Sequence, residues 1–144
     1  MKFGGTSVED VKCIKNVAKK IKNQVKKKYK VAVVVSAMAG TTDKLIDFVN
    51  QTSNNFINRE YDVVVSSGEQ ITAGLMALTL QELNVPARSW QGWQVPLKTT
   101  GNHGVARIEE ISTDNIMKKF SEGMKVAVIA GFQGISSNHR EREL

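Results

Sequence analysis

The sequence is poor in the residues that stabilise or anchor secreted and membrane proteins. Cys13 is its only cysteine, so no disulfide can form within the chain, as is usual in a reducing cytoplasm. No run reaches about 18 apolar residues, the length of a membrane-spanning helix. The first residues lack the apolar centre of a secretory signal peptide. These absences predict a cytoplasmic protein with no membrane partner. Cys13 falls within the first predicted helix, which favours a buried, structural thiol.

What is present is the composition of a globular protein. The 144 residues are 41% hydrophobic and 24% charged, with only two prolines. This length suits one domain, and it is enough to bury a core. We therefore expect a single folding unit over residues 1–144.

Positive charge is concentrated near the amino end. The net charge is +6, and nine lysines lie on or just after the first predicted helix: Lys12, Lys15, Lys19, Lys20, Lys22, Lys26, Lys27, Lys28 and Lys30. Such a helix could bind nucleic acid, anionic lipid or another acidic partner. The stretch contains no arginine and one aromatic residue, Tyr29. This favours a solvated helix face and no nucleic-acid partner.

The hydrophobic pattern predicts strands alternating with helices. Apolar residues three and four apart, from Val11 to Val25, indicate a helix of about five turns. A second helix is expected after a cap at Thr41 or Thr42, and further helices at 68–83 and 113–120. The helix at 68–83 is apolar nearly all round, so we expect it to be well buried. Strands are predicted at 30–36, 61–67, 87–90, 105–111 and 125–130, with an irregular stretch at 91–104.

This alternation predicts an α/β fold with a mainly parallel sheet and helices on both of its faces. Ligands of such sheets bind at the carboxyl ends of the strands. Each loop rich in glycine and hydroxyl groups is predicted to follow a strand. We therefore expect Gly4, Ser36, Glu69 and Gly131 to lie along one rim of the sheet.

Residues 2–7, KFGGTS, have the chemistry of a phosphate-binding turn. Two glycines allow a sharp bend, and the following helix directs its free N–H groups to the same place. Lys2 adds a cation. The spacing is neither that of a Walker A loop nor G-x-G-x-x-G. From chemistry alone, an ordinary strand-to-helix turn stays open as the alternative.

Several motifs, in this order, resemble the catalytic domain of the aspartate kinases, in the amino acid kinase family. They are KFGGTSV at 2–8, VSAMAGTTDKL at 35–45, SSGEQ at 66–70, SWQGWQ at 89–94, TTGNHG at 99–104, ARI at 106–108 and AGFQG at 130–134. The resemblance covers nearly the whole chain, except about its last eight residues.

The resemblance implies a sandwich of helices around a mainly parallel sheet, an αβα fold that is incomplete in this chain. It also implies transfer of the γ-phosphoryl group of ATP, with Mg²⁺, to the side-chain carboxylate of L-aspartate, in lysine, threonine and methionine synthesis. Lys2 is then the catalytic cation, and Phe3, Gly4, Gly5 and Ser36 lie on the nucleotide side. Thr42 and Glu69 hold aspartate, with Glu69 facing its ammonium group. No residue of this chain is implied as a metal ligand.

Each of these side chains also has a plain structural interpretation. Lys2 could be a solvated terminal lysine, Thr42 a helix cap, and Glu69 a carboxylate that serves only the helix dipole. The reaction itself needs positioning and charge neutralisation, because the attacking carboxylate is already ionised at neutral pH. No histidine base is required.

The sequence departs from the family at both ends. Only Met1 precedes Lys2, whereas a strand usually has about five residues, so we expect Lys2 to be poorly anchored. The family continues after Gly134 with Arg-Gly-Gly-Ser-Asp, the rest of the nucleotide half and regulatory domains. We therefore expect residues 1–144 to be an amino-terminal part of the kinase domain, with a tail at 136–144 of unrelated sequence. Such a chain is expected to be inactive alone, with a separately encoded second half or a second copy as partner. The alternative is a non-catalytic module that binds an acidic partner through its lysine-rich helix.

Overall fold

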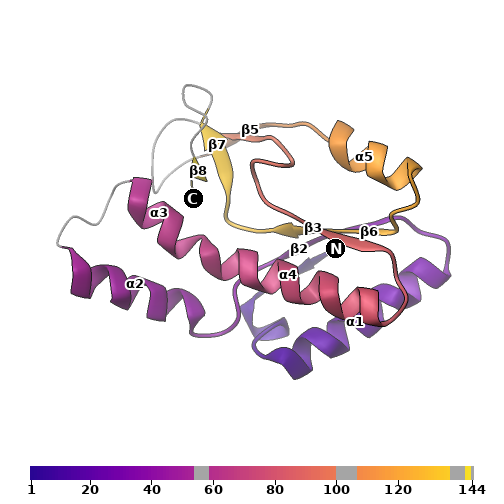
Figure 1. The fold of residues 1–144 in the computed structure, drawn as a ribbon, viewed down its shortest axis with the longest axis horizontal. Coiled ribbons are helices and arrows are strands. Elements are labelled where there is room, and N and C mark those ends of the chain that lie inside the picture. The colour runs from indigo at the N-terminus through magenta and orange to yellow at the C-terminus, as the bar shows by residue number, and fades with distance from the viewer. Residues whose placement is uncertain (54–58, 100–106, 137–141, 144) are drawn as a thin grey trace.

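Four parallel strands form the central sheet of the computed structural model, which describes residues 1–53, 59–99, 107–136 and 142–143. Their order is β1 (Lys2–Phe3), β2 (Val31–Val35), β6 (Val126–Ala130) and β3 (Ala87–Trp90). The longest pairing runs from Val31 beside Val126 to Val35 beside Ala130. The predicted α/β class with a mainly parallel sheet is confirmed (Figure 1).

The first strand is short, yet it is held in the sheet. Lys2 pairs with Val34, and the ammonium group of Met1 donates to the carbonyl oxygen of Ala32 at 2.7 Å. The Val34 N–H in turn donates to the carbonyl oxygen of Met1 at 2.9 Å. The expectation that Lys2 is poorly anchored is therefore wrong, because main-chain pairing with β2 fixes even two residues.

Helices α1 (Val11–Lys26) and α4 (Ser67–Glu82) cover one face of this sheet. The main core forms between them and the strands, around Ile14, Ile21, Val33, Met76 and Leu80. The lysines of α1 are exposed except Lys22, which is half-buried and donates from Nζ to the carbonyl oxygen of Leu83 at 2.9 Å, and the helix is amphipathic as predicted. Its predicted apolar stripe is nearly right, but Val11 is exposed and Val17 is buried.

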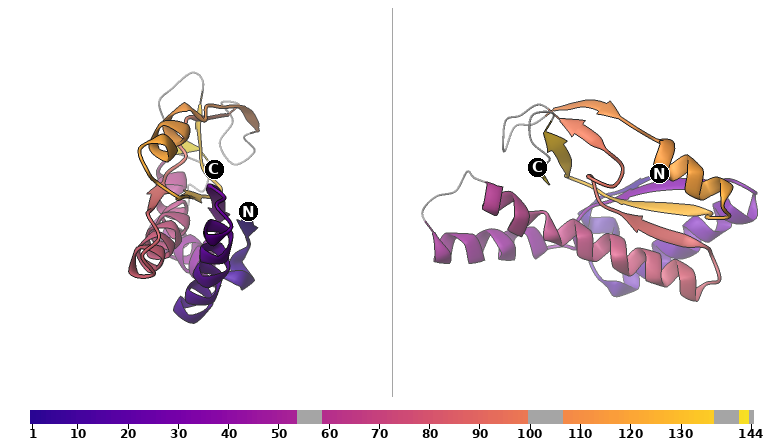
Figure 2. Two further views of the ribbon diagram at one scale, coloured as in Figure 1. Left: turned by 90° about the vertical axis from the view of Figure 1, so that its right-hand side faces the viewer. Right: turned by 45° about the horizontal axis from the view of Figure 1, so that its top comes forward.

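The opposite face is covered less completely. Helix α5 (Asp114–Ser121) packs there, with Phe120 in a second cluster that includes Trp90 and Ala127 (Figure 2). Beside it lies an apolar cavity of about 520 Å³, whose lining includes Ala32 and Val34 of β2. The apolar run at 31–35 is typical of a parallel strand buried on both faces, whereas Ala32 is exposed.

A predicted strand is a helix in the structure. Residues 61–65 belong to α3 (Arg59–Val65), and residue 67 begins α4 after a turn at Ser66. Helix α3 packs beside α2 (Thr41–Thr52). The Ser66 N–H donates to the carbonyl oxygen of Asp62, and Asp62 and Val65 are buried one helical turn apart. The β-branched run Val63–Val65 favours a strand only weakly, and packing outweighs that preference.

A second, smaller sheet has the strand order β5-β4-β7-β8. It consists of β4 (Leu97–Thr99), β5 (Ile108–Ile111), β7 (Gly134–Ser136) and β8 (Arg142–Glu143). The sequence predicts β5, but residues 91–104 have the composition of an irregular stretch, so β4 is not predicted. Residues 100–106 and most of the tail lie outside the described residues.

One helical stretch among the described residues, Arg59–Glu82, could cross a membrane by its length and composition alone. Half of its apolar window is buried inside the protein. Core helices of water-soluble proteins have the same properties, so this feature is weak evidence for a membrane span.

Candidate functional site

The carboxyl ends of the parallel strands form one rim of the sheet, as predicted. Gly4 follows β1, Ser36 follows β2 and Gly131 follows β6. The Ser36 N–H donates to the carbonyl oxygen of Phe3 at 3.2 Å, and the Gly131 N–H donates to that of Val35 at 2.9 Å. These bonds hold the ends of three neighbouring strands together.

Glu69 reaches this rim from helix α4. Its Oε1 atom accepts a hydrogen bond of 3.2 Å from the main-chain N–H of Ala37, next to Ser36. The Glu69 carboxylate therefore lies at the rim, although the segment before it is a helix and not the predicted strand. The sequence does not predict this role of Ala37, because a main-chain donor leaves no signature in the side-chain pattern.

The Glu69 carboxylate is buried, and only one of its two oxygens has a hydrogen-bond partner among the described residues. Its side chain is 5% exposed, and its Oε2 atom has no hydrogen-bond partner among the described residues. Burial raises the pKa of Glu69 above its ordinary value of 4.5, and the hydrogen bond from Ala37 opposes that rise. A buried carboxylate oxygen without a donor is costly for folding, so it is a candidate for binding a cationic or hydrogen-bonding ligand.

This raised pKa gives a testable dependence of stability on pH. Because the folded state binds the Glu69 proton more tightly than the unfolded state, its contribution to stability is fully present below pH 4.5. That contribution is lost as the pH rises through the folded-state pKa. Urea unfolding at several pH values should show the loss, with a slope of at most about 1.4 kcal/mol per pH unit. Glu69→Gln should remove the part of the pH dependence that Glu69 causes. If the two proteins differ in free energy of unfolding by the same amount at every pH, the raised pKa of Glu69 is contradicted.

The start of α2 borders the same place. A Cβ atom on Gly68 would lie 3.0 Å from Ala37 Cβ and 3.4 Å from Thr41 Cγ2, so α2 and α4 meet closely here. The helix begins at Thr41, after Gly40 in the left-handed region with φ of 71°, and not after a threonine cap. Thr42 lies in the first turn, half-buried. It is thus near the Glu69 end of the rim.

Lys2 and Glu69 approach the rim from opposite faces of the sheet. Phe3 packs against the main core under α1 and α4, and neighbouring side chains of a strand point to opposite faces. Lys2 therefore belongs to the face of its partner Val34, which lines the apolar cavity. Gly5 lies close to Ala37, because a Cβ atom on Gly5 would be 3.5 Å from the Ala37 carbonyl oxygen.

Gln133 ties three parts of the rim together. It is 8% exposed. Its Nε2 donates to the carbonyl oxygen of Ser66 and its Oε1 accepts from the N–H of Gly92, both at 3.0 Å. A Cβ atom on Gly92 would lie 2.8 Å from Gln133 Cβ, so only glycine fits beside it. Both residues stand in the quoted motifs, AGFQG and SWQGWQ, but the sequence gives no sign that they meet.

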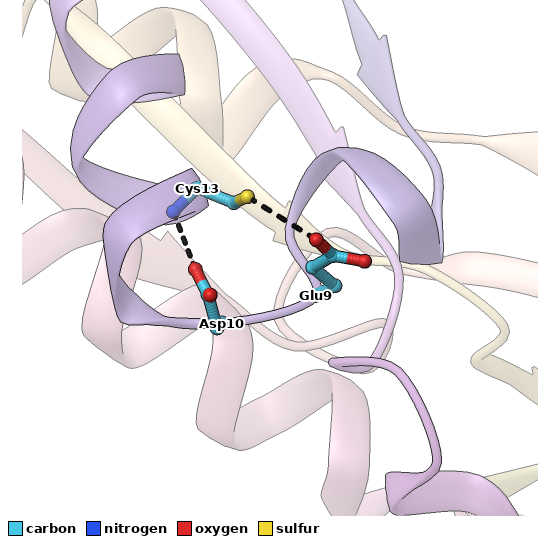
Figure 3. A group of neighbouring side chains, drawn as sticks. All are labelled: Glu9, Asp10 and Cys13. Carbon is cyan, nitrogen blue, oxygen red and sulfur yellow. Dashed lines mark hydrogen bonds between the residues drawn. The ribbon is translucent and has the colours of Figure 1, made fainter.

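Glu9, Asp10 and Cys13 are the one group of metal-ligand type among the described residues (Figure 3). Asp10 caps α1 by accepting from the Cys13 N–H at 2.7 Å, and the Cys13 thiol donates to Glu9 Oε1 at 3.8 Å. Desolvation and the Asp10 carboxylate raise the pKa of the Cys13 thiol, which disfavours the thiolate that binds metals. The arrangement is a helix cap, and Cys13 is half-buried at that cap, not fully buried as expected.

Comparisons with known proteins agree on one family. The family model described as the amino acid kinase family matches residues 1–142. An aspartokinase of Rickettsia conorii is 46% identical over 142 residues, which are 96% of this chain and 35% of that protein. The chain thus spans about a third of the length of such curated relatives.

Solved structures give the same picture. The crystal structure of aspartate kinase from Synechocystis matches 99% of this chain and 23% of its own, with a TM-score of 0.78 and 42% identity. E. coli aspartokinase III in complex with aspartate and ADP matches 99% of this chain and 42% of its own, with a TM-score of 0.76. The identity to the latter is 21%, so that match supports the fold alone.

Proposed function

Because this chain belongs to the amino acid kinase family, we propose that it is the amino-acid-binding part of an aspartate kinase. The reaction is transfer of the γ-phosphoryl group of ATP to the side-chain carboxylate of L-aspartate. The names of its relatives support aspartate as the acceptor, and membership of a kinase family supports a nucleotide as the donor.

The observation that carries this proposal is the buried Glu69 carboxylate. Ala37 fixes one of its oxygens, and the other has no partner among the described residues. An ammonium group supplies hydrogen-bond donors and the opposite charge, which together satisfy such an oxygen. The α-ammonium of aspartate is such a group, and Thr42 is near enough along the rim to assist in holding the amino acid.

The Gly4-Gly5 turn is the proposed nucleotide side. The first N–H groups of the short helix η1 (Gly5–Ser7) have no partner within that helix, so they can donate to phosphate oxygens. A Cβ atom on Gly4 would meet nothing within 4 Å, which leaves room for a close approach. Phe3 anchors this turn in the core, Ser36 borders it, and Lys2 supplies positive charge from the other face of the sheet.

The groups described at the rim suit a phosphoryl transfer in which the protein positions the two substrates. ATP supplies the reactive phosphoryl group. The aspartate side chain is ionised at neutral pH, so the chain needs to orient it and to neutralise charge, without a general base. Mg²⁺ prefers carboxylate oxygens, but the Glu69 carboxylate at this rim is already assigned to the ammonium group of the amino acid. We therefore assign the metal to the nucleotide phosphates and name no ligand for it in this chain.

The alternative of an acidic partner on the lysine-rich helix gains no support. Apart from Lys22, which is half-buried and bonded to Leu83, its lysines are exposed on one side of an amphipathic helix, as on ordinary solvated surfaces. A cytoplasmic location is part of the proposal, as the single cysteine suggests.

A chimaera tests the proposed function. Residues 1–142 of this chain would replace the matching region of the Rickettsia conorii aspartokinase, and product would be measured as aspartyl hydroxamate with ATP and Mg²⁺. We expect activity from the chimaera and no turnover from the 144-residue chain alone. We further expect Lys2→Ala to lower the activity of the chimaera by about 100-fold or more. A folded chimaera that phosphorylates no acceptor, or an acceptor other than aspartate, would show that the assignment is wrong.

A further inference from the structure

The apolar cavity beside α5 is a formed site that the proposed function leaves unused. Its volume of about 520 Å³ falls within the usual range of small-molecule sites, about 300–1,000 Å³. The sheet contributes Ala32, Val34 and Ile129 to its lining, and helix α5 contributes Ile116 and Phe120. The cavity therefore lies on the face of the sheet away from the main core, where α1 and α4 pack.

Large apolar side chains are exposed around this cavity. Phe132 is 63% exposed, Ile108 is 61% exposed and Met117 is 57% exposed, and all three belong to the lining. Exposed apolar side chains that gather in this way mark a binding site. The Gln133 amide also belongs to the lining, but both of its ends are engaged in hydrogen bonds within the protein. The part of a ligand that enters the cavity must therefore be apolar.

A lysine stands at the edge of the cavity. Lys2 pairs with Val34 in the parallel register, so the two side chains lie on the same face of the sheet, and Val34 lines the cavity. Lys2 is exposed, and no ion pair of its ammonium group is found among the described residues. Lys30, just before β2, already lies over the ring of Phe120, with Nζ 6.0 Å from the ring centroid. Lys2 is thus placed to meet an anionic group at the end of the cavity near the rim.

We propose that this cavity binds an amphiphilic anion, a medium-chain carboxylate such as decanoate, with its chain in the cavity and its carboxylate at Lys2. Each methylene group that leaves water strengthens binding about fourfold. The carboxylate stays at the exposed edge, where Lys2 supplies the opposite charge and neither group has to be buried. This inference does not depend on the proposed kinase activity.

Isothermal titration calorimetry of the 144-residue chain at neutral pH tests the ligand class without any substitution. Decanoate should bind at one site per chain. Hexanoate has a shorter chain and should bind roughly 50-fold or more weakly, because it buries fewer methylene groups. Decyltrimethylammonium has a chain of the same length and the opposite charge, and it should bind roughly 10-fold more weakly. Equal affinity for decanoate and decyltrimethylammonium, binding of many molecules per chain, or no binding of decanoate overturns the proposal.

A pair of lysine substitutions tests the position of the carboxylate. Lys2→Gln should weaken decanoate binding roughly 3- to 5-fold, the effect of an exposed ion pair. Lys30→Gln is the matched control and should leave the affinity unchanged. Both lysines are exposed, so we expect both variants to fold. Decanoate binding that depends on Lys30 and not on Lys2 overturns the proposal.

A substitution that fills the cavity tests the position of the chain. Ala32→Phe places a ring in the cavity from an exposed position of β2, and decanoate affinity should fall roughly 10-fold or more. Gln51→Phe adds the same ring at an exposed position of α2 and should change nothing. If Ala32→Phe does not fold, the titrations of the parent chain and of the two lysine variants still decide the outcome. A folded Ala32→Phe protein that binds decanoate as tightly as the parent overturns the proposal.

Discussion

Replacement of Glu69 by glutamine is expected to weaken L-aspartate binding by roughly 10- to 100-fold. Glutamine keeps the size of the side chain, and its Oε1 can still accept from the Ala37 N–H. It removes the negative charge that would face the ammonium group of aspartate. Hydrogen bonds to charged groups contribute about 1.5–3 kcal/mol, which gives the stated range.

Calorimetric titration of the chimaera with aspartate and with ATP measures the effect of this change. Nucleotide affinity should stay the same, because the glycine turn offers main-chain N–H groups to the phosphates and the substitution at Glu69 leaves those groups in place. Glu109→Gln, at an exposed position of β5, removes the same charge away from the rim and should change neither affinity. Equal losses for aspartate and ATP would contradict the role given to Glu69.

Replacement of Gln133 by leucine is expected to lower the free energy of unfolding by roughly 2–5 kcal/mol. Leucine fills a similar volume but leaves the Gly92 N–H and the Ser66 carbonyl oxygen without their partner. Each buried polar group that loses its hydrogen bond costs about 1–3 kcal/mol. We also expect weaker aspartate binding, since Ser66 leads directly into the turn of α4 that carries Glu69.

Urea unfolding of the variant and of Gln51→Leu separates this effect from the general effect of adding an apolar side chain. Gln51 is exposed on α2, so its replacement should change stability by less than about 0.5 kcal/mol. If the two variants unfold at the same urea concentration, Gln133 does not hold the rim together as its contacts indicate.

The sequence predicts the elements whose pattern repeats over enough residues. Helix α1 has several turns of regularly spaced apolar residues, and β6 is an uninterrupted apolar run, so both are found within a few residues of their predicted ends. Helix α3 is short and rich in valine, so its local preference points to a strand, and only packing beside α2 and the following helix decides the outcome. Strand β4 is missed because three residues carry no periodicity.

The sequence predicts those parts of the candidate site that side chains form. The sequence places Gly4, Ser36, Glu69 and Gly131 along one rim, and the structure confirms that placement, while their roles in binding stay predictions. The contacts that position them are made by main-chain groups, such as the Ala37 N–H and the Ser66 carbonyl oxygen. Any residue type can supply those groups, so no sequence pattern reveals them. The position of Lys2 across the sheet from Glu69 follows from strand register, which is likewise set by pairing.

The short first strand bears on how the protein should be produced in the laboratory. Beyond Met1, the edge of β2 opens into a shallow groove of about 430 Å³ lined by Tyr29, Lys30, Val31 and Ala32. An affinity tag joined to Met1 replaces its ammonium group by a peptide N–H and runs into this groove. A tag rich in valine or threonine can extend the strand there and raise the melting temperature, whereas a glycine-rich tag cannot. Measurements of stability are therefore comparable only between preparations that share the same amino-terminal residues.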